Sequence, residues 1–248
     1  MVIDSDVFPY VVAILKKSSY ISAGALIDDN WVVTAADSLF LLRESLRLIR
    51  IRLGSTNYRK GGILLPIKSL DVHPYFDDKK PEFDIALIML PERVRLSYSL
   101  NPIRVQKYYK GVMATHFIVT AWSNAVESKE QKIESMEAIK RRRLLTVSHL
   151  HPSTTDSCSR QLSALGINQT ETIMCLDPTL DSDPCTRDVG APVVLNGILY
   201  GVISSWKPDN CDEQPGSTFV TLAAAANISS WIHATIRGHR WSHQADDH

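Results

Sequence analysis

Four cysteines carry the first chemistry that this sequence offers. Cys158, Cys175, Cys185 and Cys211 all lie in the second half of the 248-residue chain. Their even number suits two disulfide bonds, and they show no CxxC or mixed Cys/His spacing of the kind that binds zinc. We therefore expect two disulfides, no zinc centre and an oxidising compartment.

Histidines offer a second possibility, because imidazole is the commonest metal ligand in proteins. His149 and His151 alternate along a predicted strand and so share one of its faces. An ordinary pair of surface histidines is the preferred interpretation. The loop after Gly54 has none of the carboxylates that hold calcium. We predict no metal and no other cofactor.

The elements that must position these residues are mostly strands. Short apolar segments rich in Val, Ile and Thr recur between turn residues, which predicts an all-β sandwich or barrel. Asn196 and Gly197 separate two of the segments and are typical of a tight hairpin. Helix is expected at residues 127–142 and 223–236. The predicted strands are residues 10–15, 23–27, 31–35, 48–53, 63–70, 85–90, 117–121, 143–149, 172–175, 191–195, 198–204 and 218–222.

Composition limits the classes of partner and the location. Lys plus Arg and Asp plus Glu both number 27, so net charge favours neither a nucleic acid nor any other bulk polyanion. No apolar run approaches the roughly 20 residues that span a bilayer. The first twenty residues do not resemble a signal peptide. Sequons at Asn168 and Asn227 nevertheless fit glycosylation and an extracellular, secreted protein.

Five segments stand in order along the chain: FPYVVAIL (8–15), SAGALI with WVVTAAD (22–27 and 31–37), FDIALIML (83–90), CTRDVGAPVV (185–194) and GVISSW (201–206). Together they resemble the trypsin-like (S1 family) serine proteases. The resemblance implies an all-β fold of two packed six-stranded antiparallel β-barrels with a C-terminal helix. It implies one domain over residues 1–236, with barrels at about 8–103 and 104–222 and a helix at 223–236. The His-rich composition of residues 237–248 predicts a disordered tail.

The resemblance also places the catalytic positions, and two of the three triad residues are changed. The general-base histidine aligns with Asp37, the triad aspartate with Asp84 and the nucleophilic serine with Val189. Valine has no heteroatom to attack with, and a carboxylate is a weaker base than imidazole. Arg187 replaces a glycine whose N–H helps to build the oxyanion hole. We expect no serine protease activity.

Asp37 leaves two interpretations open. If the fold holds, it lies close to Asp84, and like charges at short range raise one pKa of the pair. Acid hydrolases use such carboxylate pairs. In the simpler interpretation, Asp37 faces solvent or pairs with Arg187 in an inactive cleft.

The specificity-pocket positions implied by the resemblance are Asp183, Ser205, Trp206, Lys207 and Gly216. Asp183 aligns with the aspartate that gives trypsin its preference for Lys and Arg, although an incidental acidic residue would also explain it. Lys207 stands where trypsin keeps a glycine. Our hypothesis is that Lys207 narrows the pocket and pairs with Asp183.

The cysteines agree with the same resemblance. It pairs Cys158 with Cys175 and Cys185 with Cys211. Ser22 and Ser38 occupy both positions of a further family disulfide, so no unpaired thiol remains. The loss of one bridge, worth about 2–4 kcal/mol, is tolerable in a well-packed barrel.

These features predict a catalytically inactive serine protease homologue that acts by binding. It would be an adaptor, decoy or cofactor in an extracellular cascade such as an immune one, with a protease, or a protease substrate or inhibitor, as partner. The alternative is a polyanion-binding or antimicrobial effector that binds heparin-like chains through residues 139–143 with Arg43, Arg47, Arg50, Arg52, Arg59 and Lys60. A third possibility is an active trypsin-like endopeptidase, against which the missing nucleophile and base argue.

Overall fold

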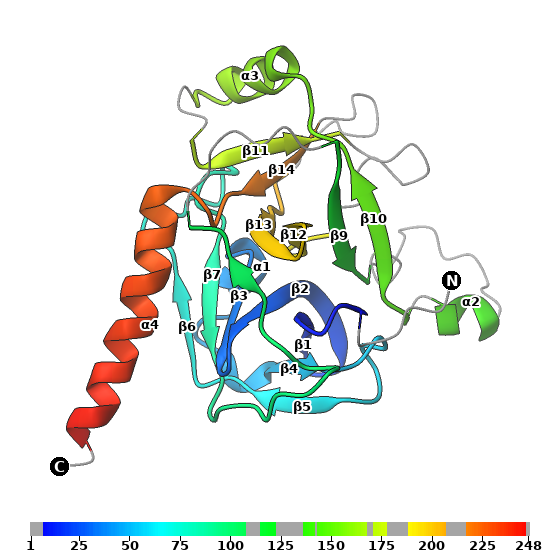
Figure 1. Ribbon diagram of the computed structural model, residues 1–248, viewed down its shortest axis with the longest axis vertical. Coiled ribbons are helices and arrows are strands. Elements are labelled where there is room, and N and C mark those ends of the chain that lie inside the picture. Colours follow the sequence, from blue (N-terminus) through cyan, green and yellow to red (C-terminus); the bar gives the residue numbers. More distant parts are fainter. Residues whose placement is uncertain are drawn as a thin grey trace.

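Two curled antiparallel sheets pack against each other in this protein, with helices at their margins (Figure 1). The computed structural model describes residues 7–107, 115–122, 136–141, 143–167, 171–177, 188–206 and 217–246. This arrangement is the predicted all-β fold with a C-terminal helix.

The first sheet comes from the N-terminal half of the chain. Its order is β5-β4-β1-β2-β3-β7-β6, and neighbouring strands are antiparallel. In β4 the side chains of Ile49, Ile51 and Leu53 are buried while Arg50 and Arg52 face outward, because successive residues of a strand point to opposite faces. The strands are β1 (Val11–Lys16), β2 (Ser19–Asp28), β3 (Trp31–Thr34), β4 (Ile49–Leu53), β5 (Ile63–Pro66), β6 (Ser69–Val72) and β7 (Ala86–Met89).

The second sheet comes from the C-terminal half. Its order is β10-β9-β12-β13-β14-β11, and β8 pairs in parallel with β13. The hairpin predicted at Asn196 and Gly197 is confirmed: both residues have positive φ, 51° and 73°, and join β12 to β13. The strands are β8 (Arg104–Val105), β9 (Phe117–Ala121), β10 (Thr146–Leu150), β11 (Ile173–Leu176), β12 (Pro192–Leu195), β13 (Ile198–Ile203) and β14 (Thr218–Thr221).

The strand count differs from the prediction. Each sheet has seven strands in the described part of the chain, where six were expected. The segment 63–70 forms two strands, β5 and β6, at opposite edges of the first sheet. Pro66 ends β5 and has no N–H to donate, which suits an edge strand. The two-residue strand β8 lies outside all the strands predicted from sequence.

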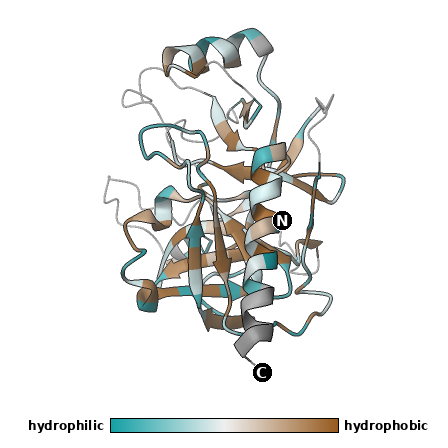
Figure 2. Ribbon diagram, turned by 90° about the vertical axis from the view of Figure 1, so that its left-hand side faces the viewer, coloured by the Kyte–Doolittle hydropathy of each residue, from teal (hydrophilic) through white to brown (hydrophobic). Residues whose placement is uncertain are grey.

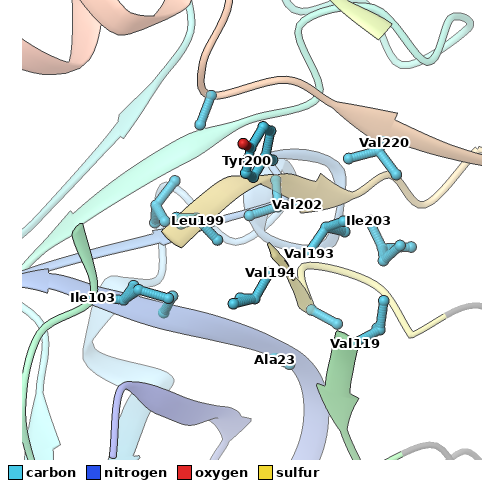
Figure 3. Close-up of a cluster of buried hydrophobic side chains, with 14 of the residues drawn as sticks. Ala23, Ile103, Val119, Val193, Val194, Leu199, Tyr200, Val202, Ile203 and Val220 are labelled. Carbon is cyan, nitrogen blue, oxygen red and sulfur yellow. The ribbon is translucent and has the colours of Figure 1, made fainter. Parts of the chain in front are cut away.

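The core runs continuously from one sheet to the other. Figure 3 shows Val193 and Val194 of β12 between Ala23 of β2 and the side chains of β13. Colouring by hydropathy shows apolar residues along the strands and polar ones in many of the connecting loops (Figure 2). The two halves are therefore joined by a shared apolar interior.

Short helices lie between the strands, and one of them carries a disulfide. The α3 helix was not predicted, and its N-terminus is capped by Thr154, whose hydroxyl accepts from Ser157 N at 3.4 Å. Cys158 of α3 is bonded to Cys175 of β11, the pairing that the resemblance implied. The helices before the C-terminal one are α1 (Asp37–Phe40), the 3-10 helix Leu46–Leu48, α2 (Met136–Arg141) and α3 (Thr155–Ala164).

The C-terminal helix, α4 (Ala226–Asp246), is longer than predicted. The expected disordered tail is wrong for residues 237–246, which continue the helix. The reason is contact with the first sheet: the ring centroids of His239 and Trp31 are 5.2 Å apart, and His239 Nε2 lies 3.5 Å from the Asp71 carboxylate. In the described residues, no helix has both the length and the apolar character needed to cross a bilayer.

Candidate functional site

Asp84 is the centre of the site, and its buried carboxylate joins the two halves of the molecule. Its Oδ1 accepts from the backbone N–H of Asp37 at 2.9 Å. Its Oδ2 accepts from the Ser204 hydroxyl at 2.7 Å, Ser205 N at 2.8 Å and the Ser205 hydroxyl at 3.2 Å. Asp37 follows β3 of the first sheet and Ser204 follows β13 of the second, so four hydrogen bonds meet at one side chain across the interface.

Local structure directs Asp84 into this position. The preceding residue, Phe83, has a positive φ of 56°, a backbone region that non-glycine residues rarely adopt. Its ring is stacked on His73 with centroids 4.8 Å apart and meets Tyr75 edge-on at 5.6 Å. Aromatic packing therefore holds the strained residue next to the carboxylate.

Burial raises the pKa of Asp84, because a charged carboxylate loses water when it is buried. The hydrogen bonds from Asp37, Ser205 and Ser204 oppose that shift, and the negative charge of Asp37 adds the smallest contribution in the raising direction. Asp37 and Asp84 are in contact, as the dyad interpretation required. The contact between them, however, is made by the Asp37 backbone and not by a shared proton.

Val189 lies in a turn fixed between the sheets. Its carbonyl accepts from Ala23 N at 2.9 Å, and the next residue, Gly190, donates its N–H to Ile203 O at 2.8 Å. Gly190 has a φ of 72°, and a Cβ there would overlap the Ala23 carbonyl oxygen and the Thr34 hydroxyl. Ile203 directly precedes Ser204, whose hydroxyl donates to Asp84. The turn at Val189 is therefore connected to Asp84 through the hydrogen bond of Gly190 to Ile203 and that of Ser204 to Asp84.

His73 is the histidine nearest to Asp84 in the sequence, and it is enclosed. Its side chain is 3% exposed, its ring contacts Phe83 and Trp231 at centroid distances of 4.8 Å each, and its Nδ1 accepts from Tyr75 N at 3.3 Å. Burial lowers the pKa of His73 to about 4. The neutral imidazole of His73 therefore links α4, through Trp231, to the segment that carries Phe83 and Asp84.

Four apolar or aromatic side chains and one arginine form a rim beside Asp37. We use the term rim for Phe40, Leu41, Arg43, Tyr75 and Phe76. The rings of Phe40 and Phe76 meet edge-on at 5.2 Å, and the Arg43 guanidinium lies 4.1 Å over the Phe40 ring. Leu41 is 87% exposed and Tyr75 is 72% exposed. Large exposed apolar side chains gathered at one place are typical of protein-binding surfaces.

The predicted pocket residues are only partly covered by the structure. Ser205 binds Asp84, and Trp206 packs edge-on against Phe219 with ring centroids 5.1 Å apart. Sequence reasoning missed Ser204, although its place beside Ser205 in GVISSW was the available signal. The predictions for Asp183, Arg187, Lys207, Gly216, the Cys185–Cys211 pair and Asn168 fall outside the described residues. Asn227 is exposed in the first turn of α4.

His149 and His151, interpreted from sequence as an ordinary surface pair, lie on the β9–β10 edge of the second sheet. His116 joins His149 and His151 there, with ring centroids 5.2 and 6.3 Å from its own. His151 Nδ1 is 2.5 Å from Thr115 O, and His116 Nδ1 is 3.1 Å from the Thr115 hydroxyl. In the described part of the chain, no three His, Cys, Asp or Glu side chains are placed to hold a metal ion.

Comparisons with known proteins agree with this geometry. A family model described as Trypsin matches residues 3–232. Trypsin 5G1 of Aedes aegypti is 28% identical over 87% of this chain and 75% of its own length, and trypsin alpha of Drosophila melanogaster is 25% identical over 92% and 82%. Mouse neuropsin, a serine protease, shares the fold with a TM-score of 0.73 at 22% identity, over 94% of this chain and 97% of its own.

Proposed function

This chain belongs to the trypsin family of serine proteases, and we propose that it is a member without proteolytic activity that acts by binding other proteins. The observation that carries the proposal is the residue set around Asp84. Asp84 keeps its hydrogen bonds to Ser204 and to the backbone of residue 37, while residue 37 itself supplies a carboxylate and residue 189 an alkyl group. Neither residue 37 nor residue 189 therefore supplies the imidazole base or the hydroxyl nucleophile that serine protease catalysis uses.

His73, His116, His149 and His151 are not placed to replace the missing base. A general base must reach its proton within about 3 Å or through one water. His73 is enclosed by aromatic rings, and its Nδ1 accepts from Tyr75 N. His116, His149 and His151 belong to the β9–β10 edge, whereas Asp84 precedes β7 of the first sheet.

The binding role is supported by the rim beside Asp37. Loops on this scaffold are surface segments whose side chains vary without disturbing the core. The exposed Leu41 and Tyr75 offer apolar anchors of the kind that dominate protein interfaces. We propose that the partner is a protease, or a protease substrate or inhibitor. The disulfide between Cys158 and Cys175 supports secretion as the setting.

Fluorophosphonate labelling tests the loss of activity, because the reagent reacts with an activated serine. We expect no labelling of the chain under conditions that label active trypsin fully, and no cleavage of peptide substrates from pH 4 to pH 9. Val189→Ser should remain unlabelled, because it restores the hydroxyl and not the base. Labelling of the unmodified chain would contradict the proposal. Cleavage that emerges only in acid would support the carboxylate dyad of Asp37 and Asp84 instead.

Surface plasmon resonance tests the binding role. The chain is immobilised and exposed to active trypsin, to a protein inhibitor of trypsin and to the complex of both. We expect saturable binding to at least one of them, weakened about thirtyfold by Leu41→Ser with Tyr75→Ser, since each anchor is worth about 1 kcal/mol and the two together about 2 kcal/mol. Tyr98→Ser is the matched control, because Tyr98 is 92% exposed and lies outside the rim. Equal effects of rim and control variants would contradict the assignment of the rim.

A further inference from the structure

Basic side chains from three separate parts of the chain gather on one surface, away from Asp84. The outward face of β4 carries Arg50 and Arg52. Their guanidinium groups donate to carbonyl oxygens of the chain itself, Arg50 to Arg47 O at 2.7 Å and Arg52 to Tyr58 O at 2.9 Å. Arg52 also donates to Gly61 O. These bonds fix the two cations and use only part of the five donors of each guanidinium.

The turn between β1 and β2 joins this surface. Arg59 Nη1 donates to Ser18 O at 2.8 Å, and Lys17 N donates to Leu48 O at 2.8 Å. Strand pairing brings the end of β1 beside β4 as well, with Lys16 opposite Ile49. The exposed Lys16 and Lys17 therefore lie next to the arginines of β4 and of the loop after it.

The segment after α2 adds the third group of cations. Tyr58 N donates to Arg143 O at 3.2 Å, and Leu145 N donates to Thr56 O at 2.7 Å. The last turn of α2, with Lys140 and Arg141, directly precedes this contact. In Figure 1, α2 lies on the opposite side of the molecule from α4. Residues more than eighty positions apart in the sequence thus form one surface.

We define the basic surface as Lys16, Lys17, Arg47, Arg50, Arg52, Arg59, Lys60, Lys140, Arg141 and Arg143. Residues 16–27, 46–68 and 138–149, which supply it, contain no Asp or Glu. The nearest acidic residue in α2, Glu137, is paired with Arg141 at 3.6 Å. Arg43, grouped with these residues on sequence, instead covers the Phe40 ring.

Lys plus Arg equals Asp plus Glu over the whole chain. Gathering basic residues on one surface therefore separates positive from negative charge across the molecule. Charges within about 8 Å, the Debye length at physiological salt, act together on a polyanion. The total charge of a protein with no net charge does not attract a polyanion. Binding to an anionic polymer would therefore depend on a local cluster of positive charge such as this surface.

We propose that the basic surface binds a linear sulfated polysaccharide. Fixed guanidinium and mobile ammonium groups side by side suit tetrahedral anions that repeat along a polymer. Single-stranded nucleic acid is disfavoured because it needs aromatic rings for stacking. The Tyr58 ring of this surface is packed against Tyr20, with centroids 5.6 Å apart. This inference concerns a site separate from the rim and does not rest on the loss of catalysis.

The test is the affinity for a heparin oligosaccharide as a function of salt, with the full chain. Lys17→Gln, Lys60→Gln and Lys140→Gln together remove one exposed charge from each contributing segment, and no hydrogen bond of these side chains is present among the described contacts. We expect affinity at 150 mM salt to fall by about tenfold or more. The slope of log affinity against log salt should fall by about three, since each lost contact removes roughly one counterion.

Two controls make the test specific. Lys79→Gln, Lys80→Gln and Lys107→Gln remove the same charge from exposed lysines elsewhere and should leave affinity within about twofold. Leu64→Ser removes an apolar side chain that lies opposite Arg52 on the neighbouring strand. An acidic peptide would pack against the Leu64 side chain, whereas a polysaccharide would not. Equal losses from the two lysine triples, no heparin binding at low salt, or binding of polyglutamate as tight as that of heparin would overturn the proposal.

Discussion

Replacing Asp84 by asparagine should destabilise the protein by about 2 kcal/mol, because an amide cannot satisfy the four donors around it. Three donors face Oδ2, from Ser204 and Ser205, and one faces Oδ1, from Asp37 N. If the amide oxygen of the asparagine faced the three donors from Ser204 and Ser205, its NH₂ group would face the Asp37 N–H, and two donors would meet without an acceptor. One bond is lost, worth about 1–2 kcal/mol, and the others lose their charged acceptor. Relief of carboxylate burial offsets part of that loss.

Asp84→Ala removes all four acceptor contacts and should cost about 4 kcal/mol, because two backbone N–H groups cannot turn away. The assay is equilibrium unfolding in urea, in which an unchanged slope shows that only stability has changed. Asp177→Asn is the matched control: this exposed carboxylate accepts from the Ser153 hydroxyl at 2.6 Å, and its loss should cost under about 0.5 kcal/mol. If Asp84→Asn cost no more than the control, Asp84 would not be a structural link between the sheets.

Three further predictions concern stability. Gly190→Ala should cost about 3 kcal/mol or more, and Gly166→Ala, with a similar φ of 73° and no atom within 4 Å of the added Cβ, about 1 kcal/mol; similar losses would refute the role of crowding. Between pH 6.5 and 4, His73 binds a proton in the unfolded chain but stays neutral when it is buried in the folded protein. The free energy of unfolding should therefore fall as the pH falls, by up to about 1.4 kcal/mol per pH unit. His73→Phe should reduce this dependence on pH. Replacing both Cys158 and Cys175, which are 17 residues apart, with serine should cost about 3 kcal/mol in thermal unfolding; an unchanged midpoint would contradict this.

Features encoded by neighbouring residues could be predicted from the sequence. The alternation of Ile49, Ile51 and Leu53 with outward arginines marks β4, and Asn196 with Gly197 marks the hairpin, because side-chain direction and turn angles are local properties. The apolar segments around Asp37 and Asp84 likewise placed both residues at strand ends. The structure brings them together as that reading required.

Features that depend on tertiary contacts could not be predicted. Ser204 is an ordinary serine until folding carries its hydroxyl to Asp84, 120 residues away in sequence. Residues 237–246 have the polar composition of a frayed tail, and the contacts of His239 with Trp31 and Asp71 stabilise them as helix. The approach of Arg143 to Tyr58 depends on pairing between distant loops. None of these contacts leaves a periodic signal.

The position of α4 also bears on the order in which the molecule is made. Trp31 belongs to the third strand of the chain, yet its ring contacts His239, more than 200 positions later in the sequence. A nascent chain emerging from the ribosome completes all strands of the first sheet by Met89, long before this partner exists. Synthesis is much slower than the formation of local structure. In the nascent chain, Trp31 of the first sheet therefore stays uncovered on that side until the part of α4 around His239 has been translated.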